Sequence, residues 1–516
     1  MPTDAREAAG SELRPLARGG PALEAAQERV GPTGAASTGF GPASPDLASL
    51  GPEPEPTGVS LIPDNLVAFA LRALSTRAAT ETLDLQYYMW IEDVTGQLLI
   101  REVLRAADRG VRVRLLLDDL YVRRAERALA TLDCHPLIEI RLYNPFQFRS
   151  LGLLGDAFEF LYASYRLNHR MHNKAWIVDR RLAIGGGRNI GDEYFDASSQ
   201  FNFRDMDLVV EGREASGAVA LFETYWNSGR VRPLGPIAAV TPSGGGLAEL
   251  RGALDHAAAS GEAPSYLARL EALPDLPELL ARQRFAPGAH RVSFLADPPG
   301  KGGSKGGHSR HAPMMLNTVW GVLRAAERRV VLISPYFVPG RRGAKLLIGL
   351  RRRGVIVSVL TNSLAATDVL AVHGGYARYR RRLLRAGVEL YELRRGGQQG
   401  QSLFGSGHAS LHTKAFSVDG ALAFVGSFNI DPRSAYLNTE MGIFVRHPGL
   451  AGDLDAEFAR LTDPSRSWRV TLRRGQLVWT DHADGQTREV RHEPEASLTR
   501  RVLARVLGWL PIEHQL

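Results

Sequence analysis

The stretch RMHNKAWIVD at residues 170–179 returns as SLHTKAFSVD at residues 410–419. Both stretches read His, one residue, Lys, four residues and Asp, and the similarity continues without a gap to residues 190 and 430. Over these 21 aligned positions ten residues are identical. A repeat of this length at a constant offset predicts two structurally equivalent halves.

The segments around the repeat are duplicated as well. In each half the pattern predicts a strand, a helix, a second strand and a third strand. These are residues 81–90, 96–110, 111–119 and 138–146 in the first half, and 328–340, 343–354, 355–363 and 388–393 in the second. The sequence therefore predicts an α/β protein of two lobes related by pseudo-two-fold symmetry, each with a mixed sheet flanked by helices.

The composition limits the kind of protein this is. A chain of 516 residues with 44% apolar content predicts more than one buried core. The formal net charge of +8 favours anionic partners without choosing among acidic lipid, nucleic acid and phosphate-bearing substrates. The single cysteine, Cys134, excludes an intrachain disulfide. We expect neither a secretory signal nor a membrane-spanning helix, because no stretch approaches the roughly 18 apolar residues of a span.

Five segments follow from these patterns. The first 58 residues contain nine of the 29 prolines and one aromatic residue, so we predict a disordered tail. Beyond the second lobe we predict strands joined by an Asp484-Gly485 turn. The predicted segments are a tail at 1–58, a first lobe at 59–235, a helical insertion at 236–290, a second lobe at 291–466, and C-terminal strands and a helix at 467–516.

The C-terminal helix, predicted over residues 497–510, is amphipathic. Arg500, Arg501 and Arg505 occupy one half of it. The other half carries Leu498, Val502, Leu503, Val506, Leu507, Trp509 and Leu510. This pattern is typical of a helix that packs on its own protein and also of a helix on a membrane surface, and the sequence does not choose between them.

The repeated strand carries a chemically suggestive pair of side chains. Alternate residues of a strand point the same way, so His172 shares a face with Lys174, and His412 with Lys414. An imidazole beside an ammonium suits a phosphodiester, because the imidazole can attack phosphorus or move a proton while the ammonium binds phosphoryl oxygens. One such motif alone is most often a solvated strand edge. Two copies in register predict histidines that face each other, one attacking while the other protonates the leaving oxygen.

The aspartate that completes each motif is Asp179 in the first copy and Asp419 in the second. It follows its histidine by seven positions, which in a straight strand places it on the opposite face. We therefore interpret both aspartates, although they belong to the repeated catalytic motif, as structural residues at the strand end.

Further candidates surround the two motifs. Asp205 and Glu440, one in each lobe, correspond when Met206 is aligned with Met441, and we expect them to orient the histidines through the second ring nitrogen. The glycine turn after each strand lets backbone approach a ligand. The candidates for substrate binding are Asn189, Asn429, Ser427, Tyr88 and Tyr336; the alternative for the two tyrosines is that they fill core.

Metal and cofactor signals are weak. His308 and His311 have a spacing that metals use, but no carboxylate or thiolate cluster stands nearby to complete a site. We therefore predict chemistry that needs neither a metal nor a cofactor.

The pattern His-x-Lys-x4-Asp-x6-Gly-[Gly/Ser]-x-Asn, present twice, resembles the phospholipase D superfamily. Within it, the chain is similar to the bacterial cardiolipin synthases of the C type over roughly residues 60–470, and the N-terminal tail departs from the family. The resemblance extends to LDLQYYMW (83–90), GVRVRLLLDD (110–119), SPYFVP (334–339), LTNSLAATDV (360–369), HGGYARYR (373–380) and LNTEMG (437–442).

This resemblance implies two phospholipase D-like α/β/α lobes with the site at their interface. It implies that a phosphatidyl group is transferred to phosphatidylglycerol to make cardiolipin. It also implies phosphatidylethanolamine as the donor, a choice that composition and spacing do not show. In the usual assignment for the family, His172 is the nucleophile that forms a phosphohistidine intermediate, and His412 is the general acid. Lys174, Lys414, Asn189 and Asn429 would hold phosphate oxygens. The near-symmetry of the sequence does not fix this order.

The resemblance also implies phospholipid partners, a peripheral place on the cytoplasmic face of the cell membrane, and no nucleic acid. It leaves open whether an accessory protein takes part. Two other activities stay as alternatives. A phospholipase D would use water as the acceptor after the same first half-reaction, and a phosphodiesterase or nuclease would use the same site on another phosphodiester.

Overall fold

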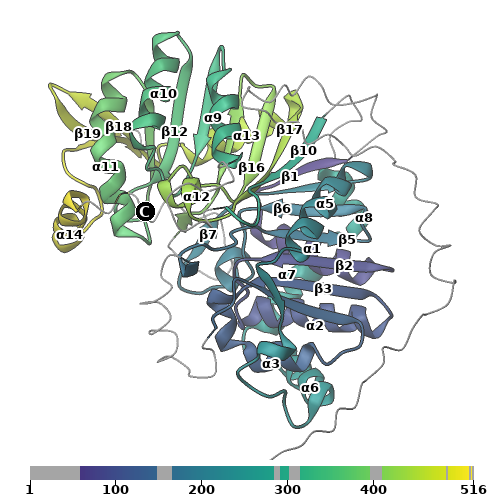
Figure 1. Cartoon of the computed structure of the whole chain (residues 1–516). Helices are drawn as coiled ribbons and strands as arrows, with labels where there is room; N and C mark the ends of the chain where they lie inside the picture. The colour runs from purple at the N-terminus through teal and green to yellow at the C-terminus, as the bar shows by residue number, and fades with distance from the viewer. Residues whose placement is uncertain are drawn as a thin grey trace, which may run out of the picture. The chain divides into compact units, whose positions relative to one another are not determined.

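Two mixed β-sheets, one in each half of the chain, form the frame of the protein (Figure 1). The computed structural model describes residues 58–147, 166–283, 291–301, 314–395, 409–483, 486–510 and 513. The tail predicted at 1–58 lies outside the described residues up to position 57, as does the turn predicted at Asp484-Gly485.

The first sheet, formed by the first half of the chain, combines parallel and antiparallel strand pairs. Strands β2, β3 and β4 run parallel, and the remaining neighbours pair antiparallel. In spatial order the strands are β1 (Val59–Ile62), β8 (Asp207–Glu211), β6 (Leu182–Gly186), β5 (Ala175–Val178), β2 (Thr82–Tyr87), β3 (Arg112–Asp118), β4 (Ile138–Tyr143) and β9 (Val231–Pro233).

The second sheet repeats all eight positions of this order and then continues with two more strands. Its strands are β10 (Arg291–Ala296), β17 (Met441–Arg446), β16 (Leu422–Gly426), β15 (Ala415–Val418), β11 (Arg329–Ile333), β12 (Ile356–Asn362), β13 (Glu389–Leu393), β18 (Ser467–Arg473), β19 (Gln476–Ala483) and β20 (Gln486–Val490). The predicted α/β duplication is confirmed. The last three strands belong to the second sheet, so the C-terminal strands are not a separate body, and the other predicted segment boundaries stay predictions.

Helices flank both sheets. In the first half they are α1 (Asn65–Ala78), α2 (Val94–Asp108), α3 (Glu126–Leu132) and α5 (Ser216–Trp226), followed by α6 (Gly246–Ala259), α7 (Ala263–Glu271) and α8 (Leu276–Gln283). In the second half they are α9 (Met314–Arg324), α10 (Gly340–Arg352), α11 (Leu370–Arg385), α12 (Pro432–Tyr436), α13 (Pro448–Leu461) and α14 (Leu498–Trp509). Among the described helices, none has both the length and the apolar composition needed to cross a bilayer.

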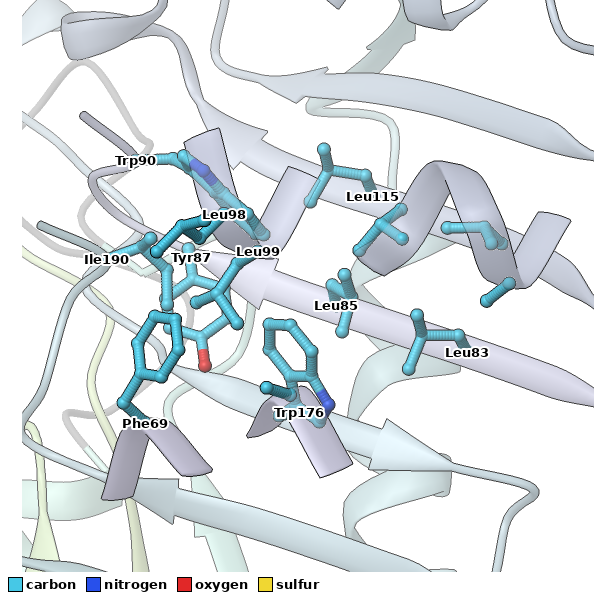
Figure 2. Close-up of a cluster of buried hydrophobic side chains, with 14 of the residues drawn as sticks. Phe69, Leu83, Leu85, Tyr87, Trp90, Leu98, Leu99, Leu115, Trp176 and Ile190 are labelled. Atoms are coloured by element: carbon cyan, nitrogen blue, oxygen red, sulfur yellow. The ribbon is translucent and has the colours of Figure 1, made fainter. Parts of the chain in front are cut away.

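The core of the first lobe shows how the strand pattern becomes packing (Figure 2). Leu83, Leu85 and Tyr87 alternate along β2, so all three point to one face of the sheet. There they meet Phe69 of α1 and Leu99 of α2, and each of these side chains is almost fully buried. The intervening residues of β2 point to the other face of the sheet and are buried as well, so most of the strand is buried.

One predicted strand is too long. Residues 328–340 were expected to be extended throughout, but β11 ends at Ile333 and α10 begins at Gly340. Pro335 and Pro339 lie in the part that is not a strand, because proline lacks the N–H that a central strand donates to its neighbour.

Two short backbone pairings join the lobes. Strand β7 (Asn202–Arg204) of the first lobe runs parallel to β14 (Ala409–Leu411) of the second. Met171 of the first lobe forms a parallel bridge with Thr439 of the second. A shared apolar cluster, including Leu208 and Ile443, accompanies these pairings.

The motif aspartates lie at the far end of the strand from the histidines. β5 ends at Val178, and Asp179 adopts a left-handed conformation with φ 48°, so the parity of a straight strand does not apply to it. Its carboxylate accepts hydrogen bonds from the backbone N–H groups of Thr80, Glu81 and Thr82, at 2.9, 2.7 and 2.9 Å. Asp419 makes the equivalent bonds to residues 327–329. Each aspartate thus anchors a hairpin to the start of the neighbouring strand.

Replacing Asp179 by alanine should lower the free energy of unfolding by about 1–2 kcal/mol, because three backbone donors lose their acceptor. Partial burial raises the pKa of Asp179, but the backbone N–H groups outweigh it and lower the pKa below its ordinary value. The stabilisation should therefore be present at neutral pH and disappear as the pH falls through that lowered pKa. Urea unfolding of Asp179→Ala and Asp179→Asn measures this. The asparagine keeps one acceptor and should lose less, and equal midpoints for all three proteins would contradict the role.

Candidate active site

The pairings between the lobes bring the two motifs together. The backbone N–H of His172 donates to the carbonyl of Thr439 at 2.9 Å, and that of His412 donates to the carbonyl of Arg204 at 2.8 Å. The residue after each of these acceptors is a carboxylate, Glu440 or Asp205. The register of each pairing therefore places one histidine beside one carboxylate of the other lobe.

Each histidine is bound through Nδ1 to that carboxylate. His172 Nδ1 lies 2.8 Å from Glu440 Oε2, and His412 Nδ1 lies 2.6 Å from Asp205 Oδ2. The sequence predicted both carboxylates, one in each lobe, but did not show that each histidine takes its partner from the opposite lobe. With Nδ1–H donating to the carboxylate, the lone pair of a neutral ring is on Nε2.

The two motif lysines are buried between the lobes. Lys174 Nζ donates to the carbonyl of His172 at 2.7 Å, and Lys414 Nζ donates in the same way to the carbonyl of His412. Burial lowers the pKa of both ammonium groups, to about 8 for Lys414 and well below the usual value for Lys174. The charge of each lysine also acts on the histidine of the other motif, so all four groups share one site.

The electrostatics of the two halves differ. Burial, followed by the charge of Lys174, holds the pKa of His172 well below its ordinary range. Burial also lowers the pKa of His412, to about 4, but here Asp205 opposes the shift. Burial thus disfavours the protonated form of both rings, and at His412 the charge of Asp205 offsets part of this effect.

The carboxylates mirror this difference. Burial raises the pKa of Glu440 to about 7. Burial also opposes ionisation of Asp205, but His412 and Lys414 together outweigh it and lower its pKa to about 2. Asp205 is thus an ionised partner of His412, whereas Glu440, beside His172, is harder to ionise.

The residue that follows Gly186 or Gly426 differs between the two motifs, and each fits the carboxylate next to it. The fully buried Ser427 hydroxyl donates to Glu440 Oε2 and accepts from the N–H of Met441 at 3.0 Å. We therefore interpret Ser427 as a support for Glu440 and no longer as a substrate-binding side chain. Gly187 occupies the equivalent position, and a Cβ there would lie 2.3 Å from Asp205 Oδ1. A side chain at position 187 would collide with the Asp205 carboxylate, so this half of the site requires glycine there.

Buried charged side chains hold the carboxylate segments, and the sequence did not point to them. Arg188 donates to the carbonyl of Asp205 at 2.6 Å. Asp297 accepts from the N–H of Glu440 at 3.2 Å and from Lys301 Nζ at 2.7 Å. The residue that corresponds to Arg188 in the second motif is Phe428, so a search for residues shared by both copies passes over Arg188.

The two predicted asparagines lie beside the motifs and are buried. Asn189 Nδ2 donates to the hydroxyl of Tyr194 at 2.9 Å, and Asn429 Nδ2 lies 3.5 Å from the hydroxyl of Ser434. Among the described residues, neither amide oxygen has a hydrogen-bond partner. The free group is an acceptor, so a hydrogen bond to a phosphate oxygen would have to come from the second hydrogen of each Nδ2, and this role stays a prediction.

Aromatic side chains border both imidazoles. The ring of Tyr88 lies 5.0 Å from that of His172. The rings of Tyr194 and Phe203 lie 5.2 and 4.9 Å from that of His412, and the sequence had not singled out either residue. Tyr336 donates its hydroxyl to Asp368 at 2.6 Å. The arrangement offers two differently tuned imidazoles and two buried ammonium groups, which fits displacement at a phosphodiester.

Known proteins resemble this chain over most of its length. The family described as cardiolipin synthase, PLD-like domain, matches residues 75–226 and 320–462, which contain both motifs. Cardiolipin synthase C of Escherichia coli (strain K12) is 39% identical over 488 residues, which cover 91% of this chain and 98% of that protein. A cardiolipin synthase of Geobacillus sp. (strain WCH70) is 25% identical over 74% of this chain and 61% of its own length.

A solved structure shares the fold. Phosphatidylserine synthase of Haemophilus influenzae Rd KW20 superposes with a TM-score of 0.57 at 15% identity, covering 89% of this chain and 95% of that one. The family match spans more than half of the chain and the Escherichia coli relative aligns along nearly its whole length. This chain therefore belongs to the phospholipase D-like cardiolipin synthase family and is an enzyme of the phosphatidyltransferase type.

Proposed function

We propose that this enzyme makes cardiolipin by moving a phosphatidyl group onto phosphatidylglycerol through a covalent intermediate on His172. The observation that carries the proposal is the pair of imidazoles bound at Nδ1 by carboxylates of the opposite lobes, with two buried lysines beside them. This arrangement provides one group to attack phosphorus and a second to move the proton.

In the first half-reaction, Nε2 of His172 attacks the phosphorus of the donor lipid. The bond from phosphorus to the headgroup oxygen breaks, and His412 gives its proton to that oxygen. The lowered pKa of His172 supports its role as nucleophile, because a neutral ring has its lone pair available. The ionised Asp205 supports His412 as the acid.

In the second half-reaction, the neutral His412 removes the proton from the terminal hydroxyl of phosphatidylglycerol. That oxygen attacks phosphorus, the bond between phosphorus and nitrogen breaks, and His172 is restored. Lys174 and Lys414 hold the phosphoryl oxygens, where negative charge collects in both transition states. Asn189 and Asn429 add hydrogen bonds to the same oxygens.

The donor in this proposal is phosphatidylethanolamine. Its leaving alcohol carries an ammonium group, and carboxylates lie on the side of the site that contains His412. Glu193 directly precedes Tyr194, whose ring lies 5.2 Å from that of His412, and Asp368 accepts a hydrogen bond from Tyr336 at 2.6 Å. These two carboxylates would favour a cationic headgroup on the acid side. Because all these lipids are held in a bilayer, the enzyme works at a membrane surface, which we assign to the cytoplasmic face.

The mass of the cardiolipin product identifies the donor lipid. Purified protein is incubated in EDTA with phosphatidylglycerol that has deuterated acyl chains and phosphatidylethanolamine that has ordinary chains. We expect cardiolipin with one labelled and one unlabelled phosphatidyl group, together with free ethanolamine. Cardiolipin labelled in both halves would show phosphatidylglycerol as the donor. Phosphatidic acid as the main product would show a hydrolase, and loss of all activity in EDTA would contradict the metal-free chemistry.

The order of the histidines can be tested with a leaving group that needs no acid. With the 4-nitrophenyl ester of phosphatidic acid, His412→Ala should release a burst of about one nitrophenolate per site and leave a phosphorylated histidine. His172→Ala should give no burst. With natural lipid both variants should lose about 10²–10⁴-fold in turnover, and the double variant should be little worse than either. A burst from His172→Ala alone would reverse the assignment.

The pH dependence follows from Lys414. Its pKa, lowered to about 8 by burial, means that the ammonium charge is present below that pH and is lost above it. Arginine stays protonated throughout this range. The ratio of kcat/KM for Lys414→Arg to that for the wild type should therefore be flat below pH 8 and rise above it, by about tenfold per pH unit. A ratio that does not change between neutral and alkaline pH would exclude this titration.

A further inference from the structure

Helix α14 rests on helix α11 through its small residues (Figure 1). A Cβ added at Gly374 of α11 would lie 2.7 Å from the carbonyl oxygen of Ala504 and 2.9 Å from the backbone nitrogen of Gly508, so the two backbones are in close contact. Arg500 reinforces this contact by donating to the carbonyls of Leu364 and Thr367. The helix therefore has a fixed orientation on the second lobe.

This orientation turns the apolar half of α14 outward. Leu498 and Trp509 are 74% and 80% exposed, and Val502 and Val506 are 52% and 48% exposed. A surface helix normally buries its apolar stripe. Here no described residue covers it, and a contiguous exposed apolar face marks an interaction surface. The sequence left open whether this helix packs on the protein or contacts a membrane, and the structure shows that packing on the protein uses a different side.

A basic cleft lies next to this face, between α14, α11 and the last strands. It has a volume of about 780 Å³. Among the described residues that line it, Glu493 is the one carboxylate, and it is already bound by Arg380 at 2.8 Å. The cationic lining consists of Arg378, Arg380, Arg381, Arg491, Arg501 and Arg505.

Part of this positive charge is uncompensated. Arg378 donates to the carbonyls of Gly508 and Leu510 and to Glu513, so it serves the attachment of the helix. Arg501 and Arg505 make no ion pair with a described carboxylate, and the Nε of Arg501 is buried without a partner among the described residues. These two arginines lie on the flank of α14 next to Trp509, which lines the cleft and also belongs to the exposed apolar half.

We propose that the α11–α14 cleft is a second lipid site, separate from the catalytic histidines, that binds the phosphate headgroup of an anionic phospholipid. The apolar half of α14 enters the acyl layer beside it. An arginine-lined cleft continuous with an exposed apolar face is complementary to an amphiphile that has a negative head and apolar chains. The inference rests on the proposed function for the presence of phospholipid, and it does not depend on the chemistry at His172.

Flotation with vesicles tests this in the full-length His172→Ala protein, so that turnover plays no part. Val502→Asp combined with Val506→Asp should lower binding about tenfold on vesicles of phosphatidylcholine with phosphatidylglycerol, because two apolar side chains no longer enter the bilayer. Arg505→Glu should lower binding about fivefold or more on the same vesicles. It should have no effect on vesicles of phosphatidylcholine alone.

Matched controls separate the cleft from general surface effects. Ile356→Asp changes an apolar residue that is 47% exposed elsewhere in the second lobe, and Arg112→Glu reverses an exposed charge in the first lobe; both should bind like the parent. Thermal melting confirms folding, and turnover of short-chain dispersed lipid with His172 restored should be unchanged in the α14 variants. Flotation of the α14 variants at the level of the parent would overturn the proposal. So would a lipid-free dimer that those variants dissociate, because the face would then belong to a second copy.

Discussion

The site depends on two short stretches of backbone that run parallel across the lobes. Met171 pairs with Thr439, and Leu411 pairs with Arg204. These pairings decide which carboxylate meets which histidine, because the next residue along each strand supplies the side chain. A slip of one position would turn every side chain to the opposite face. The ion pairs and the shared apolar cluster behind the strands hold that register.

The two halves of the site are alike in backbone and different in chemistry. One histidine is bound to a glutamate that a serine hydroxyl supports, and the other is bound to an aspartate whose approach requires glycine. The shorter, ionised carboxylate stabilises positive charge on its imidazole, whereas the longer one is harder to ionise in its buried place. Two rings in the same protein thus lie beside carboxylates that differ in how readily they ionise. This is what a reaction with one nucleophile and one acid requires.

Much of this structure could be predicted from the sequence, for physical reasons. A duplication preserves the order of the strands, so the sheets followed from matching segments, and aligning Met206 with Met441 pointed to the two carboxylates that lie beside the histidines. Alignment compares equivalent positions and not contacts, so it could not show that the lobes exchange these carboxylates. It also passed over Arg188, which only one half contains. The side on which α14 packs could not be predicted, because two small residues, and not the apolar stripe, make the contact.

The exchange of carboxylates has a consequence for how such an enzyme can arise. A single lobe carries a histidine and a carboxylate that do not serve each other, so one lobe alone has no oriented histidine. Two identical lobes in separate chains could also exchange carboxylates, but every substitution would then appear on both sides of the site. Joining both copies in one polypeptide removes that restriction. A serine can remain on one side and a glycine on the other, and each half is free to specialise in one of the two roles.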